Sequence, residues 1–218
     1  MGKRVFMVIG IVLLLGCNVY AYDDGDFQVW NTEVEEVKIN KNSKITLEEE
    51  FRFANDASDF FYHHYDGGYV YAMNKFLDLG INYRQVYEKK QGKKIKQENR
   101  PHINAILKHD LFGFSLEDRN RLEYRHFDYQ PDTFRYRNKF TVKFPWKFTK
   151  FKIQPFIADE IFLVFYNKAF TRNRFYTGAG ATFTKNLKGE LFYLLQSNRD
   201  GKKWKQSNVL GVKIKLVF

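Results

Sequence analysis

Apolar and polar side chains alternate along most of the chain after residue 22. In the segment 45–53, positions 45, 47, 51 and 53 are apolar, and the even-numbered positions carry Thr, Glu, Glu and Arg. The segments 134–144 and 210–218 show the same pattern, with basic residues on the polar face. A period of two is that of a β-strand whose two faces meet different surroundings. Helical periodicity of useful length is missing after residue 22, so the pattern predicts an all-β chain.

Turn residues separate the alternating segments and predict eleven strands in a single domain over residues 22–218. The strands are expected near 27–39, 43–54, 60–72, 76–88, 100–109, 113–127, 134–145, 151–165, 171–184, 189–198 and 207–218. The connections are expected to alternate, with short turns near 40–42, 74, 110, 146–150 and 185–188, and longer loops near 55–59, 89–99, 128–133, 166–170 and 199–206. Asp118 and Asn120 share the parity of the apolar Leu116 and Leu122, and we expect a β-bulge to re-aim them.

Alternation alone does not tell a soluble sandwich, whose apolar faces turn inward, from an outer-membrane barrel, whose apolar faces meet lipid. Three features favour the barrel. The connections are expected to alternate short and long, Phe218 closes the last alternating strand, and aromatic residues recur near strand ends. The aromatic residues are Tyr69, Tyr71, Tyr83, Tyr87, Tyr124, Phe127, Phe144 and Trp146.

The predicted fold is therefore all-β: an antiparallel transmembrane β-barrel of the outer-membrane type with a polar, filled lumen. Bacterial single-chain barrels have an even number of strands, and the pattern indicates eleven. Either another strand begins near 22–30, or the segment 27–39 lies inside the barrel or at its seam. The expected number is thus about 10–12 strands.

The first 21 residues are typical of a secretory signal. Lys3 and Arg4 form the basic start, Val5–Gly16 the apolar segment, and cleavage is expected after Ala21. The apolar segment has about 12 residues, whereas a bilayer-spanning helix needs roughly 20. Lipidation of Cys17 is the alternative, because the residues before it resemble a bacterial lipobox. The expected location is the cell outer membrane.

Composition narrows the possible partners. The chain of 218 residues has 36 Lys and Arg against 25 Asp and Glu, a formal charge of +11. Removing residues 1–21 takes away two basic residues, and 36 − 2 − 25 leaves +9. A single Cys excludes a disulfide-stapled miniprotein and a Cys-based metal cluster, and 23 Phe and 14 Tyr exclude a disordered polyelectrolyte. An exported chain is not expected to meet nucleic acid, so the charge points to solvent, lipid phosphates or acidic glycans.

Short motifs spread over the chain carry a resemblance to a known family. They are 26–30 (DFQVW), 119–125 (RNRLEYR), 134–137 (FRYR), 155–160 (PFIADE) and 173–175 (NRF). They resemble an uncharacterised family of bacterial outer-membrane β-barrels, domain of unknown function 2490, over nearly the whole chain after the signal. The resemblance implies a barrel without implying an activity. Phe218 also looks like the carboxyl-terminal assembly signal that such barrels present to the barrel assembly machinery.

The polar faces of the predicted strands carry charges of both signs, which we expect to point into the lumen. This predicted charge network is Glu48, Glu50, Arg52, Arg84, Glu117, Arg119, Arg121, Glu123, Arg125, Arg135, Arg137, Glu160 and Arg174. One interpretation is a structural plug of ion pairs, since buried charges are normally paired. The other is an Arg-lined, porin-like path for small anionic solutes, because the network holds eight Arg and five Glu.

Signals for an enzyme or a metal site are sparse. Ser58 precedes His63 and His64 by a few positions, and His126 ends a predicted strand whose opposite end carries Ser115. Neither a G-x-S-x-G nor an H-E-x-x-H motif occurs. Adjacent histidines on a strand point to opposite faces and do not chelate one ion. We therefore expect a non-enzymatic protein without catalytic residues, metal or cofactor.

The densest basic run lies in the predicted loop 89–99, which we expect outside the cell. It comprises Lys89, Lys90, Lys93, Lys94 and Lys96. The run is either a solvated loop or a site that bridges the phosphates of lipopolysaccharide. The leading hypothesis for the whole protein is an outer-membrane barrel that is structural, holds a ligand or forms a narrow channel. The alternatives are a lipid-modifying hydrolase of the outer membrane and a soluble periplasmic barrel of the lipocalin type.

Overall fold

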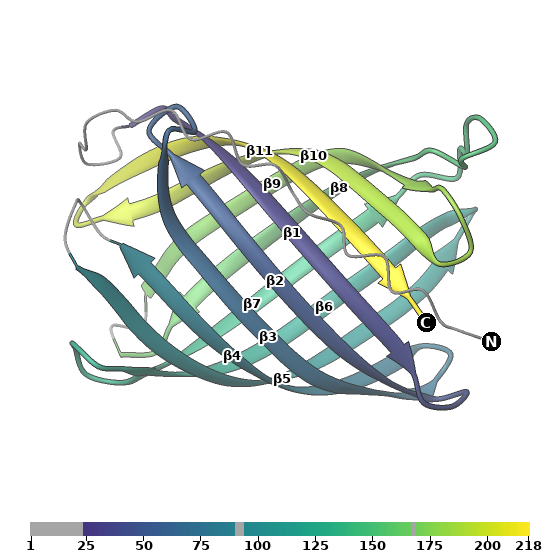
Figure 1. The fold of residues 1–218 in the computed structure, drawn as a ribbon, viewed down its shortest axis with the longest axis horizontal. Helices are drawn as coiled ribbons and strands as arrows, with labels where there is room; N and C mark the ends of the chain where they lie inside the picture. The colour runs from purple at the N-terminus through teal and green to yellow at the C-terminus, as the bar shows by residue number, and fades with distance from the viewer. Residues whose placement is uncertain (1–23, 90–93, 167–168) are drawn as a thin grey trace, which may run out of the picture.

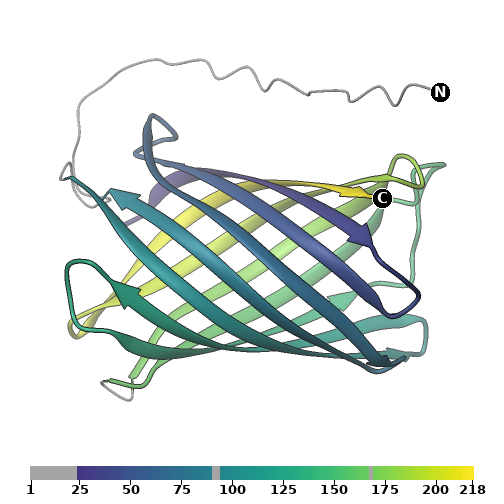
Figure 2. The same ribbon diagram turned by 60° about the horizontal axis from the view of Figure 1, so that its bottom comes forward.

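The computed structural model describes residues 24–89, 94–166 and 169–218. Within these residues the chain forms eleven strands that close into a barrel, with the strands tilted to its axis, as Figure 1 and Figure 2 show. The strands are β1 (Asp26–Lys38), β2 (Ser43–Ala54), β3 (Asp59–Asn74), β4 (Leu77–Lys89), β5 (Ile95–Leu111), β6 (Phe114–Phe127), β7 (Thr133–Lys143), β8 (Gln154–Val164), β9 (Ala169–Thr182), β10 (Leu187–Asp200) and β11 (Lys203–Val217). The predicted signal 1–21, including Cys17 and the cleavage site, lies outside the described residues.

The barrel closes between its first and last described strands. Consecutive strands pair antiparallel, whereas β1 and β11 pair parallel. An odd number of alternately directed strands leaves the first and the last running the same way, so the seam has the slanted hydrogen bonds of a parallel ladder. The seam runs from Asp26 beside Ser207 to Glu36 beside Val217. The segment 27–39 therefore belongs to the wall, at the seam.

Side chains alternate between the lumen and the outside as the sequence pattern predicts. On β2, the outward Leu47 is 51% exposed, whereas the inward Arg52 is 8% exposed. Exposed apolar residues continue around the barrel through Ile81 on β4, Ile103 on β5 and Leu191 on β10. The apolar faces thus lie outside and many charged groups inside, which is the reverse of a soluble sandwich.

The expected alternation of short and long connections is confirmed only in the middle of the chain, where 75–76 and 112–113 are shorter than 90–94 and 128–132. At one end of the barrel, which we call end A, the connections are 55–58, 90–94, 128–132, 165–168 and 201–202. At the opposite end, end B, they are 39–42, 75–76, 112–113, 144–153 and 183–186. The longest lies at end B, where short turns were expected, and much of the predicted loops 89–99 and 199–206 is strand. Polar residues extend these ladders because backbone pairing does not require apolar side chains.

The β-bulge expected at Asp118 and Asn120 is also wrong, because β6 keeps a continuous register with β7 from Ser115 to Arg125. The two polar side chains stay on the outer face. Asn120 donates a hydrogen bond to Asp118 at 3.0 Å, and Asn138 on β7 donates to both. These contacts satisfy polar groups that would otherwise face apolar surroundings unpaired.

Apolar side chains fill one side of the lumen. Trp30 on β1, Tyr176 on β9 and Leu194 on β10 belong to a buried cluster with neighbours on β8 and β11. Phe192 of this cluster packs over Gly211, where an added Cβ would come within 2.1 Å of its ring. Glycine on β11 therefore makes room for the phenyl ring, and side chains fill the middle of the barrel.

Candidate functional site

At the centre of the lumen, each carboxylate binds more than one arginine. Glu123 on β6 is 0% exposed and accepts hydrogen bonds from Arg135 at 2.6 Å and from Arg137 at 2.9 Å. Glu160 on β8 accepts from Arg137 at 2.7 Å and from Arg119 at 2.8 Å. A buried carboxylate is costly unless it is both paired and hydrogen-bonded. These contacts provide both, and Arg137 links the two carboxylates.

A second cluster surrounds Glu98 on β5, nearer to end A. Arg100 donates to this carboxylate at 2.6 and 2.8 Å, and Arg125 donates to it at 2.7 and 2.8 Å. Bidentate pairs of this kind are among the stronger protein hydrogen bonds. The sequence pattern places Glu98 in the loop 89–99, which left it out of the predicted network, and Arg100 was left out although it begins the predicted strand 100–109. Glu98, Arg100 and His102 occupy alternate positions, and this spacing indicates that they share one face of a strand.

A third cluster joins β2, β3 and β4. Arg84 donates to Asp66 at 2.7 Å and to Glu48 at 2.9 Å, and Nε2 of His64 lies 3.1 Å from Glu48. Nε2 of His102 on β5 lies 3.6 Å from Asp66. Three of these buried residues, Asp66, His64 and His102, are missing from the predicted network. Two glycines follow Asp66, and they obscure the alternation on β3.

All charges of the predicted network except Glu117 take part in ion pairs. The pairs include Arg52–Glu50, Arg84–Glu48, Arg119–Glu160, Arg121–Glu123, Arg125–Glu98, Arg135–Glu123, Arg137–Glu160 and Arg174–Glu160. Glu117 is half-buried on β6 opposite Lys108, and it has no ion pair within the described residues. The structure thus brings together charges that are far apart in the chain.

Arginines outnumber carboxylates in the two clusters around Glu98, Glu123 and Glu160. Their arginine partners are Arg100, Arg119, Arg121, Arg125, Arg135, Arg137 and Arg174, and 7 − 3 leaves a formal +4. Nε of Arg119 and Nη1 of Arg121 are buried without a hydrogen-bond partner in the part of the chain that the structure describes. Uncompensated positive charge in poorly hydrated surroundings attracts anions.

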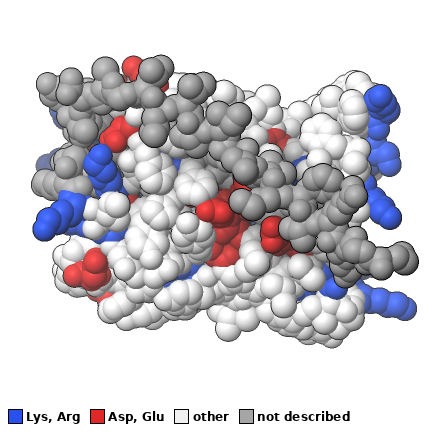
Figure 3. Space-filling view, viewed as in Figure 1, with Lys and Arg blue, Asp and Glu red and all other residues white. Residues whose placement is uncertain are grey.

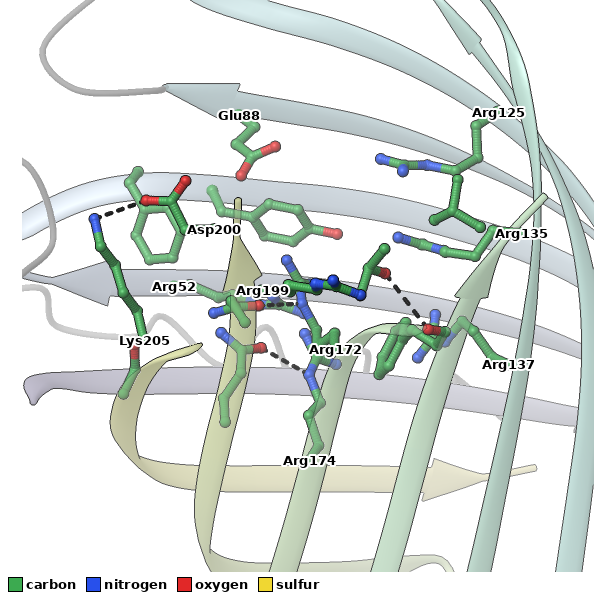
Figure 4. Close-up of a pocket in the computed structure, with 18 of the residues that line it drawn as sticks. Arg52, Glu88, Arg125, Arg135, Arg137, Arg172, Arg174, Arg199, Asp200 and Lys205 are labelled. Atoms are coloured by element: carbon green, nitrogen blue, oxygen red, sulfur yellow. Dashed lines mark hydrogen bonds and ion pairs between the residues drawn. The ribbon is translucent and has the colours of Figure 1, made fainter. Parts of the chain in front are cut away.

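A cavity of about 680 Å³, which we call the vestibule, reaches end A, where Lys96, Gln130 and Asp200 line it (Figure 4). Its charged lining residues are Arg52, Arg84, Lys96, Arg100, Arg125, Arg135, Arg137, Arg172, Arg174, Arg199 and Lys205, against Glu88 and Asp200. The Glu98 and Glu123 clusters supply several of these arginines. The vestibule is therefore a strongly cationic space that opens beside the ion-paired centre.

Side-chain amides hold two vestibule arginines that lie on β9. Nε of Arg172 donates to Asn198, and Nε of Arg174 donates to Gln196 at 2.8 Å; each amide is directly opposite on β10, and Figure 4 shows the two arginines on the same side of the cavity. Within the described residues, Arg172 has no ion pair with a carboxylate. An amide orients a guanidinium without neutralising its charge.

Guanidinium groups cover the aromatic rings of the vestibule. Arg52 lies 3.6 Å and Arg174 4.7 Å from the centroid of the Trp30 ring. Phe162, which is 1% exposed, has Arg137 at 4.6 Å and Arg174 at 4.9 Å. Cation–π contacts of this kind hold guanidinium groups in place. An apolar ligand therefore meets little ring surface here.

A smaller cavity of about 240 Å³ lies at end B, and lysines line it instead of arginines. They are Lys143, Lys152, Lys188, Lys213 and Lys215. Lys215 pairs with Glu36 at 2.7 Å. Both ends of the lumen are thus cationic, but guanidinium forks line the vestibule, and these match oxyanions better than ammonium groups do.

Aromatic clusters lie on the outer face near both ends. Near end A, His63 stacks on Tyr87 with ring centroids 4.6 Å apart. The next residue, His64, faces the lumen. Near end B, Phe144 stacks on Trp146 at 5.2 Å. Figure 3 shows Lys and Arg mostly toward the two ends, with a mostly white surface between them that a red patch of acidic residues interrupts. Phe127, which was expected in the outer belt, is 5% exposed and has the inward parity of the charges on β6, so its expected placement is wrong.

Three glutamates interrupt the apolar outer surface. Glu33 and Glu35 are exposed on β1, and Glu49 on β2 is directly opposite Glu33. They line a surface groove of about 510 Å³ together with Tyr65 and Tyr83. No ion pair neutralises any of the three within the described residues, and like charges directly opposite each other are destabilising.

Ser58 and His126, which the sequence raised as catalytic candidates, lie near end A without forming a nucleophile–base pair, and Ser115 lies near end B. Ser58 donates to the backbone oxygen of Asn55 at 2.6 Å, whereas Nδ1 of His126 lies 2.9 Å from Asp132. Tyr124 also donates to Asp132, at 2.5 Å. The hydrogen bond from His126, followed by that from Tyr124, lowers the pKa of Asp132 to about 2. In the described ranges no hydrogen bond joins Ser58 to His126, and the histidine ties the connection 128–132 to β6.

The predicted basic run is divided between several places. Lys90 and Lys93 lie outside the described residues. Lys89 ends β4, Lys94 is exposed, and Lys96 on β5 lines the vestibule. Of the described lysines of this run, Lys96 therefore lies at the end-A opening of the vestibule.

Among the described residues, no helix is long and apolar enough to cross a membrane. No curated protein matches the chain. The model of the family described as protein of unknown function, DUF2490, matches residues 27–208, a range that begins in β1 and ends in β11. The chain therefore belongs to this family of unknown function, and in this chain the matched residues form the β-barrel.

Proposed function

We propose that the protein is a non-enzymatic barrel of the outer membrane that takes small anionic solutes into its vestibule. The inverted distribution of side chains carries the proposal. Leu191 is 56% exposed on the outside, whereas Glu123 and its arginines are buried inside. In an outer-membrane barrel, an apolar outer band meets lipid and a polar interior faces the lumen.

The two outer aromatic clusters support the membrane location. Aromatic rings are enriched where a bilayer meets water, and stacked rings lie near both end A and end B. Lysines beyond them suit the phosphates of outer-membrane lipid and lipopolysaccharide. We propose Phe218, which is 62% exposed beside the seam, as the contact for the barrel assembly machinery.

The filled centre favours solute binding over free flow through a pore. Phe192, Leu194 and Val209 are buried on one side of the lumen, and Glu123 and Glu160 hold arginines on the other. Small barrels have interiors that side chains fill, whereas much larger ones leave an aqueous channel. The vestibule is thus proposed as a chamber that is closed at its inner end.

The two alternative functions have less support. A hydrolase needs a nucleophile bonded to a base, and the hydroxyl of Ser58 is instead bonded within its own connection. A lipocalin-like barrel needs an apolar cavity, whereas guanidinium groups cover Trp30 and Phe162 in the vestibule.

Cell fractionation combined with gel migration tests the location. The full chain, expressed in a Gram-negative cell, should stay in the outer-membrane fraction after an alkaline wash. It should also migrate differently on a gel before and after boiling, because a folded barrel resists detergent. Recovery in the soluble fraction without detergent would contradict the proposal.

Planar bilayers test the closed centre. The inserted wild-type barrel should show little steady conductance, because side chains fill its middle. The Phe192→Ala variant removes a ring from that filling and should raise conductance with a preference for anions. A large, steady conductance of the wild-type protein would overturn the closed chamber and favour an open channel.

A further inference from the structure

The β9–β10 side of the vestibule has few carboxylates to neutralise its arginines. Arg174 lies 3.6 Å from Glu160, but that carboxylate already binds Arg137 at 2.7 Å. Glu88 attracts the positive charge of Arg172 from across the cavity, but the two side chains do not form an ion pair. At the rim, Asp200 pairs with Lys205 at 2.9 Å. This side of the cavity therefore keeps a local excess of positive charge.

Three guanidinium groups converge on this side. Arg172 and Arg174 share one face of β9, and alternate residues of a strand lie roughly 7 Å apart. Arg52 on β2 and Arg174 both contact the ring of Trp30, at 3.6 and 4.7 Å from its centroid. The charge of Arg52 repels both β9 arginines, although Arg52 also pairs with Glu50 at 2.5 Å. Figure 4 shows the three arginines grouped on one side of the cavity.

Among the residues that the structure describes, no hydrogen bond engages the two outer nitrogens of Arg172. Asn198 accepts from Nε of Arg172, and Gln196 accepts from Nε of Arg174. Both amides are directly opposite their arginines in the ladder, so the guanidinium groups are oriented before any ligand binds. Preorganised forks bind oxyanions with little loss of side-chain freedom.

We propose that Arg172, Arg174 and Arg52 form a site for the phosphoryl group of a small, soluble phosphate monoester. The inference rests on the proposed function, because the vestibule must be open to solvent at end A. A phosphate monoester carries nearly two negative charges at neutral pH and three acceptor oxygens on one atom. Convergent guanidinium forks match that arrangement, and a cavity of about 680 Å³ has room for the rest of the molecule.

Calorimetry of the full chain in detergent micelles without lipid tests the site. Glycerol 2-phosphate is the probe, and chloride and malonate are compared with it at fixed ionic strength. The variants are Arg172→Gln, which removes the fork, and Arg172→Lys, which keeps the charge. Lys147→Gln, an exposed position in the connection 144–153 at end B, is the matched control for a lost positive charge. Anomalous gel migration before boiling shows that each variant is folded.

We expect glycerol 2-phosphate to bind wild type more tightly than chloride or malonate does. Arg172→Gln should weaken this binding roughly 10- to 100-fold, the effect of losing a hydrogen-bonded charge. Arg172→Lys should lie between Arg172→Gln and wild type, and Lys147→Gln should match wild type. Equal affinity of Arg172→Gln and wild type would overturn the site, and so would equal binding of chloride.

The source of the phosphoryl group is tested with lipopolysaccharide micelles. Binding of glycerol 2-phosphate in their absence supports a soluble ligand, whereas binding of lipopolysaccharide alone overturns it in favour of a lipid headgroup. A barrel that inserts into the outer membrane but binds only chloride leaves the proposed function standing and refutes this site. Failure to enter the membrane refutes the proposed function itself.

Discussion

The centre of the lumen and the β9 side of the vestibule contain the same kind of side chain with different partners. Arg135 and Arg137 bind Glu123, a carboxylate that is 0% exposed. Arg172, farther toward end A, binds the neutral amide of Asn198. A charged partner neutralises a buried arginine and makes it part of the packing, whereas an amide orients it and leaves its charge available.

The different partners give arginine two roles in this barrel, one in stability and one in anion binding. Central arginines are needed by their carboxylates, so changes there should cost stability. Arg172 in the vestibule has no ion pair with a carboxylate among the described residues and is repelled by Arg174, so a change there should cost anion binding and little stability.

The largest effect is expected for Glu123→Gln. Removing one partner of a buried ion pair leaves the other charges uncompensated, which costs about 3–5 kcal/mol. The free energy of unfolding by urea in detergent measures the loss. Asp200→Asn is the control, because Asp200 pairs with Lys205 at the rim with a side chain that is 65% exposed. Equal losses in the two variants would contradict a special role for the centre.

A smaller loss is expected for Gly211→Ala, which tests the apolar filling beside the central arginines. The added methyl would come within 2.1 Å of the Phe192 ring, and overpacking of this kind costs about 1–3 kcal/mol. Gly180→Ala is the control, since the nearest atom to its Cβ would be Cγ of Glu190 at 3.6 Å. Comparable urea unfolding curves for the two variants would show that the filling is loose.

Glu49 and Glu50 are neighbours on β2, and within the described residues only Glu50 pairs with an arginine. Comparing the two shows what the arginine partner contributes. Glu50 pairs with Arg52 at 2.5 Å in the lumen, whereas Glu49 faces outward opposite Glu33. In phospholipid vesicles, Glu49→Leu should stabilise the barrel by about 1 kcal/mol, because an acid at the lipid face is unfavourable. Glu50→Leu should destabilise it. Destabilisation by both, measured by urea unfolding, would show that lipid does not cover this face.

Arg172→Gln should change the free energy of unfolding by less than about 1 kcal/mol in buffer without multivalent anions. The variant loses a hydrogen bond to Asn198 but also relieves repulsion from Arg174. Arg135→Gln is the matched variant at the centre and should be clearly less stable, since it leaves Glu123 short of a partner. Equal stability of the two variants in urea would contradict the prediction that arginines at the centre contribute more to stability than Arg172 does.

The smallest effect is expected at the mouth, from Asp132→Asn. The hydrogen bond from His126 lowers the pKa of Asp132 to about 2, below an unfolded value of about 3.9. Its stabilising effect is therefore complete above pH 4 or so and fades as the pH falls toward about 2. Wild type should unfold at slightly higher urea than Asp132→Asn at neutral pH. The gap should close in strong acid, and a constant gap would mean that the carboxylate charge is not responsible.

Much of the barrel wall was predictable from the sequence. The segments 45–53, 134–144 and 210–218 have in the structure the faces that their alternation indicates, because side-chain direction in a strand depends only on position along it. The lumen position of Arg121 and Glu123 follows from the same rule. The extent of each strand was less predictable, since polar residues beyond the apolar belt still pair their backbones. For that reason Glu98 was assigned to a loop, although it holds two arginines.

The sequence by itself determined which side chains of a strand share a face, and that charges of both signs share one of the two faces. The tertiary structure decided which charge meets which. Arg137 on β7 joins Glu123 on β6 to Glu160 on β8, the parallel contact of β1 with β11 closes the ring, and Arg172 is left with Asn198. Alternation is a local property with a period of two, whereas these pairings depend on strand register and on the closure of the barrel, which bring together residues far apart in the chain.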